Sequence, residues 1–164
     1  MALPLLITEI PQIKRFRINR FALIIGSLLP DIIDKPILLL GLGNGRFFSH
    51  NLLFIITSFL IVFFLSKRNL EISIPFLVGT SIHLILDLPY VPLFYPFISY
   101  EFIVVEEPVL YWFNTLFTNP IVLSTEIIGI AILIFILIHN KLYHVEDIKK
   151  YLNGSLQIAY KNED

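Results

Sequence analysis

The sequence of 164 residues contains no cysteine, and few of its residues are charged. Without cysteine there is neither a disulfide framework nor a thiolate metal site, so a bound metal would need histidine and carboxylate ligands. Charged residues make up 15% of the chain and the formal net charge is -1, so no basic field indicates binding of nucleic acid. The G-x-S-x-G motif of one serine hydrolase class is also missing.

Long hydrophobic stretches are what the chain does have. Hydrophobic residues make up 56% of the sequence, against roughly 45–50% in soluble domains. A membrane-spanning helix needs about 20 mostly apolar residues, and four stretches approach this length: 21–42, 50–65, 72–88 and 120–138. The sequence therefore predicts an all-α, multi-pass integral membrane bundle of about four transmembrane helices, surrounded by membrane lipids.

The basic residues predict how this bundle is oriented, because Lys and Arg favour the cytoplasmic side. One predicted side carries Lys14, Arg15, Arg17, Arg20, Lys67, Arg68, Lys141, Lys149 and Lys150, and the other carries Arg46, Glu101, Glu106 and Glu107. We therefore expect a protein of the cytoplasmic membrane with both termini in the cytoplasm. It would comprise an interfacial N-terminal arm (1–20), the bundle (21–139) and a polar cytoplasmic tail (140–164). Because the basic cluster follows the first apolar residues, we expect no cleavable signal peptide.

Five ionisable residues lie within or beside the apolar stretches at a similar predicted depth, in the outer half of the bilayer: Asp31, Asp34, His50, His83 and Asp87. Such residues are costly in a membrane, at roughly 2.5–3.5 kcal/mol each. His83 and Asp87 are spaced i, i+4 and share a helix face. Two histidines and three carboxylates can bind a divalent metal, with zinc or manganese favoured.

Three short motifs resemble those of one family. The segments "GSLLPDIIDKP", "GRFFSHNLLF" and "GTSIHLILDLP" resemble, in order, the motifs of the YdjM-like family of membrane-bound, metal-dependent hydrolases. The resemblance covers residues 22–97 and implies a multi-pass membrane protein with a metal site. It carries over Asp31 and Asp34 from the first motif, His50 from the second, and His83 and Asp87 from the third. The first motif departs from the family, because it has no histidine and its second aspartate is displaced by one position.

Two functions follow from this pattern. In the first, the protein is a metal-dependent hydrolase at the outer bilayer interface that acts on a phosphate or lipid ester. Arg46, helped by Lys35, would bind the phosphate, and Asp34 or Glu126 would take a proton as general base. In the second, the protein is not catalytic, and the cluster is a structural metal site or a hydrogen-bonded knot that locks helices together.

Each of these residues also has a structural interpretation. His83 and Asp87 can form a simple i, i+4 pair, and Asp34 can cap a helix that starts near Pro36. Arg46 can anchor the chain at the interface by snorkelling. Glu126 can hydrogen-bond within its own helix. Pro30 and Pro36 are each expected to kink or end the first helix, and residues 89–97 are expected to form a turn that roofs the site.

Overall fold

The computed structural model describes residues 2–40, 45–101 and 107–155. Within them every regular element is a helix: α1 (Ala2–Thr8), α2 (Pro11–Lys14), α3 (Arg20–Leu39), α4 (Leu52–Leu65), α5 (Leu70–Leu86), α6 (Pro108–Thr118), α7 (Pro120–His139) and α8 (Val145–Leu152). The all-α prediction is confirmed. Glu106, the end of the predicted first span at 41–42, and residues 156–164 of the predicted tail lie outside the described residues.

Asparagine begins all four of the long apolar helices. The side chains of Asn19, Asn51, Asn69 and Asn119 each accept a hydrogen bond from a backbone N–H in the first turn of α3, α4, α5 and α7, respectively. Asparagine is among the strongest N-cap residues, because its side-chain oxygen satisfies a donor that the helix leaves unpaired. These caps fix where each helix starts.

The two prolines were predicted to kink or end the first helix, and they do not end it. Pro30 and Pro36 both lie inside α3, which continues to Leu39. Each proline removes only one N–H donor, and the carbonyl of Pro30 gains a hydrogen bond of 2.7 Å from the Ser49 hydroxyl. The continuous helix keeps Asp31 and Asp34 on one rigid element.

Helices α3 and α5 form the closest helix pair, and glycine allows it. A Cβ atom placed on Gly26 would lie 2.2 Å from the carbonyl oxygen of Phe76, and one on Gly79 would lie 2.2 Å from that of Leu23. The two backbones therefore touch, as at small-residue crossings of membrane helices. This crossing fixes the end of α3 that carries the aspartates against the end of α5 that carries His83.

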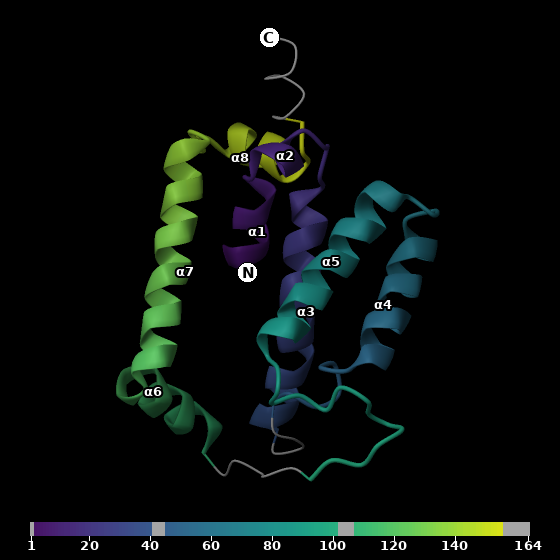
Figure 1. Ribbon diagram of the computed structural model, residues 1–164, viewed down its shortest axis with the longest axis vertical. Coiled ribbons are helices and arrows are strands. Elements are labelled where there is room, and N and C mark those ends of the chain that lie inside the picture. The colour runs from purple at the N-terminus through teal and green to yellow at the C-terminus, as the bar shows by residue number, and fades with distance from the viewer. Residues whose placement is uncertain (1, 41–44, 102–106, 156–164) are drawn as a thin grey trace.

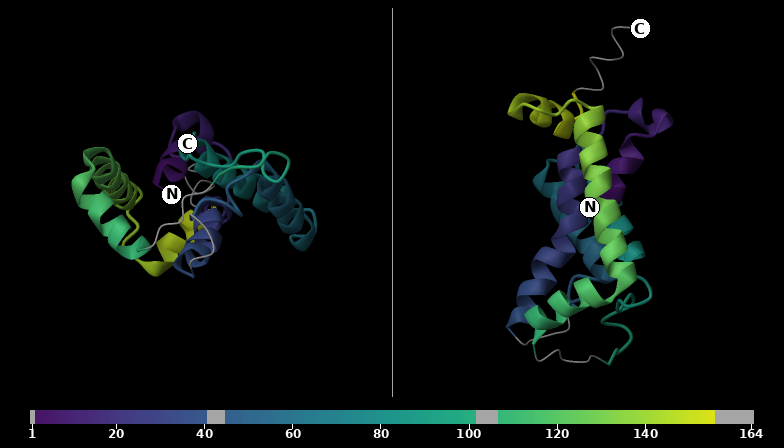
Figure 2. Two further views of the ribbon diagram at one scale, coloured as in Figure 1. Left: turned by 90° about the horizontal axis from the view of Figure 1, so that it is seen from below. Right: turned by 90° about the vertical axis from the view of Figure 1, so that its left-hand side faces the viewer.

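The helices divide into two groups that are joined by α1 (Figure 1). Helices α3, α4 and α5 form one group, α7 stands on the other side, and α1 lies between α7 and α3. Helices α2 and α8 lie across one end of the molecule, and α6 lies at the opposite end (Figure 2). A small core around Leu5, Leu23 and Ile136 joins α1, α3 and α7.

The helix lengths give fewer clear spans than the sequence predicted. Among the described residues, α7 alone is both long enough and apolar enough to cross a membrane, whereas α4 and α5 are apolar but shorter. Helix α4 has 14 residues, which extend about 21 Å, against about 30 Å for the hydrocarbon core. It starts late because residues 45–51 are not helical: the backbone there turns to contact α3.

A buried polar network holds the end of the molecule where α2 and α8 lie. The Glu9 carboxylate accepts hydrogen bonds from Lys14 (2.9 Å), Arg20 (3.3 Å), Tyr151 (2.8 Å) and Asn140 (3.1 Å). Burial alone would raise the pKa of Glu9, but these partners outweigh it, so the pKa lies below its usual value. Burial, together with the nearby Glu9 charge, raises the pKa of the Tyr151 hydroxyl. The network joins segments that are more than 100 residues apart in the sequence.

Candidate metal centre

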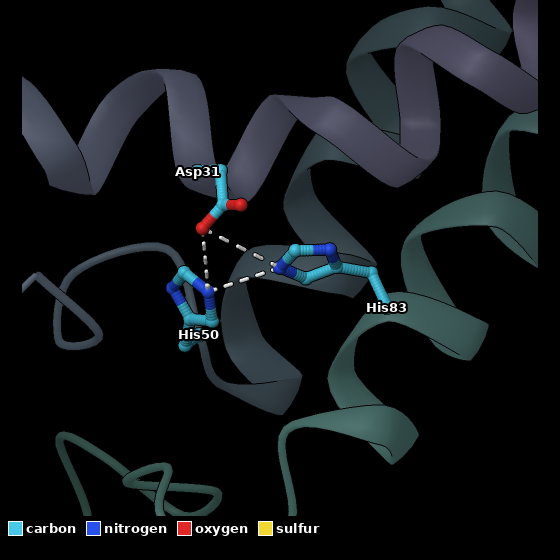
Figure 3. Close-up of side chains that lie close together, drawn as sticks. All are labelled: Asp31, His50 and His83. Carbon is cyan, nitrogen blue, oxygen red and sulfur yellow. Dashed lines mark hydrogen bonds and ion pairs between the residues drawn. The ribbon is translucent and has the colours of Figure 1, made fainter. Parts of the chain in front are cut away.

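Three segments bring a carboxylate and two imidazoles together. Asp31 comes from α3, His50 from the segment just before α4, and His83 from α5. Their side chains point toward one another (Figure 3). One ligand atom from each lies within 4.8 Å of those from the other two. The predicted convergence of these three residues is therefore seen in the structure.

The distances between the ligand atoms fit a first-row divalent metal. The Nε2 atoms of His50 and His83 are 3.1 Å apart, and the Oδ1 atom of Asp31 lies 3.7 Å and 3.9 Å from them. Tetrahedral ligands at 2.0–2.1 Å from zinc would be separated by about 3.3 Å. For the three donors to share one ion, the Asp31 oxygen must therefore approach the two imidazoles by about 0.5 Å.

Asp87 lies beside this group. Its Oδ2 atom is 3.2 Å from Nε2 of His50 and 3.4 Å from Nε2 of His83. Its Oδ1 atom pairs with Arg46 at 3.4 Å. Asp31 is arranged in the same way: Oδ1 faces the imidazoles and Oδ2 accepts a hydrogen bond of 2.7 Å from Lys35. Each carboxylate thus presents one oxygen to the histidines and the other to a half-exposed cation.

Asp34, which the sequence predicted as a ligand and as a possible base, lies on the far side of His50. Its Oδ2 atom is 2.8 Å from Nδ1 of His50, the ring nitrogen that points away from the other donors. The same carboxylate accepts hydrogen bonds from the backbone N–H groups of Phe47 (2.7 Å) and Ser49 (3.1 Å). Its side chain is 2% exposed. Asp34 therefore orients His50 and fixes the loop before α4, rather than capping a helix.

This contact determines which nitrogen of His50 can bind a cation. With Nδ1–H donated to Asp34, the neutral imidazole presents the lone pair of Nε2 to His83, Asp31 and Asp87. A carboxylate behind a histidine in this way is the usual support of a metal-bound imidazole, because it fixes both the tautomer and the ring orientation.

Glu126 is not brought to the cluster. It lies on α7, its side chain is exposed, and α7 packs mainly against α1 and α6. A cavity of about 380 Å³ at α6 is lined by Glu107, Pro108, Val109, Leu110 and Phe113, none of which belongs to the cluster.

Residues 89–97 form turns in which Leu93 accepts a hydrogen bond from the Leu52 N–H (3.0 Å), so this segment packs beside the start of α4.

One residue of the site, Ser49, and one contact, between Lys35 and Asp31, were not predicted from the sequence. The Ser49 hydroxyl binds the Pro30 carbonyl while its N–H binds Asp34, so the residue before His50 is anchored to α3 twice. Lys35 was expected to bind substrate, and its pairing with Asp31 was not expected, although the i, i+4 spacing of the two residues is a signal for it.

The fold and the site define an all-helical protein with an apolar surface and a His–Asp cluster that fits a divalent metal. A protein-family model described as "YdjM inner membrane protein" matches residues 1–146. The chain therefore belongs to the YdjM inner membrane protein family, as the three motifs indicated, and the family name supports a membrane location. Comparison with curated proteins found no match. Comparison with solved structures found none either.

Proposed function

We propose that this protein is a metal-dependent hydrolase of the membrane, in which Asp31, His50 and His83 hold one divalent ion, zinc or manganese. The observation that carries the proposal is the 3.1 Å distance between the Nε2 atoms of His50 and His83. The contact of Asp34 with Nδ1 of His50 turns the Nε2 atom of that ring toward His83. Two carboxylates face the same point. A divalent ion at this point would balance the charge of both carboxylates, and a site with Asp31, His50 and His83 as its three protein donors leaves a position open for water or substrate.

The chain's own residues would divide the remaining work. A metal held here supplies Lewis-acid activation of water and of a phosphoryl or acyl oxygen. Asp87, whose Oδ2 atom faces both imidazoles, takes the proton as general base. Arg46 contacts the other oxygen of this carboxylate at 3.4 Å and so holds the side chain in place. The sequence predicted Asp87 as a metal ligand, and in this proposal it is the base instead. The predicted bases are placed less well, because Asp34 is buried behind His50 and Glu126 is exposed on α7.

Charge at the edge of the cluster favours an anionic substrate. The side chains of Lys35 and Arg46 are 49% and 46% exposed, and each already contacts a carboxylate of the cluster. A phosphate group offers oxygens that such cations bind well. We propose a phosphate or lipid ester, reached from the outer side of a bundle whose termini lie in the cytoplasm.

The test is hydrolysis by the full chain, purified in detergent and loaded with zinc or manganese. Release of phosphate or fatty acid from phosphomonoesters and phospholipids is measured for the wild type, Asp87→Asn and Glu126→Gln. The proposal predicts metal-dependent turnover that Glu126→Gln retains. It predicts that Asp87→Asn loses at least about 100-fold in rate, as expected for a general base, while the metal stays bound. A folded, metal-loaded wild type that hydrolyses neither class would refute the hydrolase function.

A structural role for the cluster has its own support. The cluster joins α3, α5 and the segment before α4, and His50 is fully buried within it. A protonated His50 could bridge Asp34 and Asp87 without metal, because its two ring nitrogens lie 2.8 Å and 3.2 Å from those carboxylates. For this second candidate, His83→Ala would lower the melting temperature by the same amount with and without added metal.

A further inference from the structure

Helix α8, a short amphipathic helix within the predicted polar tail, is fixed across the end of the molecule. Figures 1 and 2 show it lying across the end of α7 rather than continuing it. Tyr151 holds it there: its carbonyl accepts a hydrogen bond from Arg20 at 3.2 Å, and the Arg20 guanidinium lies 4.1 Å from the centre of its ring. Its hydroxyl donates to Glu9 at 2.8 Å. Because Arg20 begins α3, the position of α8 is tied to the bundle.

Only part of the apolar face of α8 is used by this contact. Val145, Ile148 and Leu152 are spaced i, i+3 and i+7 and so lie on one face of the helix. Tyr151, at the edge of this face, is buried against Arg20, and Leu152 is partly buried against the core around Leu5, Leu23 and Ile136. Val145 remains 67% exposed and Ile148 37% exposed. In the preceding turn Tyr143 is 68% exposed. The protein therefore leaves an apolar strip uncovered beyond the end of α7.

The charges around this strip indicate what covers it. Lys149 lies next to Val145 around the helix and Lys141 precedes the helix, and both are exposed. Arg15 and Arg17, which follow the neighbouring helix α2, are exposed as well. The acidic residues Glu146 and Asp147 project from other faces of α8, and Glu146 is paired with Lys149 at 2.9 Å. An apolar strip with lysines along its border is typical of a helix that lies in the plane of an anionic membrane surface.

We propose that the strip formed by Val145 and Ile148 docks on the membrane surface, with Lys141 and Lys149 binding the headgroups of anionic phospholipids. The tail is then a lipid-binding element at the basic end of the molecule. It lies at the opposite end of α3 from the His–Asp cluster, and it does not depend on whether that cluster binds metal.

The lack of cysteine makes the test direct, because a single introduced cysteine can be labelled alone. The full chain carrying Val145→Cys or, as matched control, Glu146→Cys is labelled with a nitroxide and placed in lipid nanodiscs. Both positions are exposed in the protein itself, at 67% for Val145 and 72% for the Glu146 side chain. A difference between them therefore reports on the lipid. Collision of the label with oxygen, which concentrates in the bilayer, is compared with collision with a water-soluble nickel chelate.

In nanodiscs of equal parts phosphatidylglycerol and phosphatidylcholine, the oxygen-to-nickel ratio at position 145 should be severalfold higher than at position 146. It should fall in phosphatidylcholine alone and in the Lys141→Gln/Lys149→Gln background, and His83→Ala should not change it. Equal ratios at the two positions would overturn the proposal. So would protection at position 145 that is independent of lipid charge and of the lysines. Spin–spin broadening that disappears on dilution with unlabelled protein would assign the strip to a second copy instead.

Discussion

Replacement of Gly79 by alanine should separate the two helices that build the metal centre. The added Cβ would lie 2.2 Å from the Leu23 carbonyl oxygen and 3.0 Å from the Ser27 nitrogen, both backbone atoms that cannot rotate away. Helices α3 and α5 must then move apart by about 1 Å, a gap that forfeits a quarter to a half of the dispersion energy of each contact across it. Overpacking of this kind costs about 1–3 kcal/mol, more than the gain of up to about 1 kcal/mol from alanine's helix propensity.

The matched control is Gly129→Ala on α7, where an added Cβ meets only the Cβ of Ala2 at 4.0 Å. Thermal melting in detergent and metal content are measured for both variants. We expect Gly79→Ala to melt at a lower temperature and to bind metal more weakly, because Asp31 moves away from His83. Gly129→Ala should match the wild type or exceed it. If Gly79→Ala is as stable as Gly129→Ala and keeps its metal, the close crossing does not position the site.

Three further outcomes follow from the same geometry. Asp34→Ala should reduce metal affinity about 10–100-fold by releasing His50, measured by competition with a chelator; an unchanged affinity would show that Asp34 does not orient the ring. Glu9→Gln should flatten the acid side of the stability curve. The lowered pKa of Glu9 contributes stability that is present above its unfolded pKa of about 4.3 and is lost as pH falls through the folded value. The melting temperatures of wild type and variant, measured from neutral to acid pH, should therefore converge. A constant difference between them would contradict this. Arg20→Met should release α8, because Arg20 is 1% exposed and links Thr8, Glu9 and Tyr151. Removing one partner of a buried ion pair costs about 3–5 kcal/mol. The release of α8 is measured as faster proteolysis near residue 145.

The sequence predicted the meeting of Asp31, His50 and His83 because depth along a helix can be counted from residue numbers. It did not reveal the role of Asp34. Whether this carboxylate faces the metal or the back of His50 depends on the path of residues 45–51, and that path is set by the hydrogen bonds of Ser49 to Asp34 and Pro30.

The network around Glu9 was hidden for a different reason. Its members Glu9, Arg20 and Tyr151 are separated by up to 142 residues, and no spacing rule connects them. The position of α8 and its uncovered strip depend on this network, so they were seen only in three dimensions. The asparagine caps were not predicted either, although each asparagine directly precedes an apolar run, which is a signal for a helix start.

The most direct test of the central claim is the metal content of the purified full chain, compared with His83→Ala and Asp31→Ala. Glu126→Gln, which alters a carboxylate on α7, is the control. The account predicts about one equivalent of a transition metal in the wild type and in Glu126→Gln, as a site with three protein donors would hold, and its loss from the other two variants. A folded wild type that holds no metal after reconstitution with zinc and manganese would contradict it.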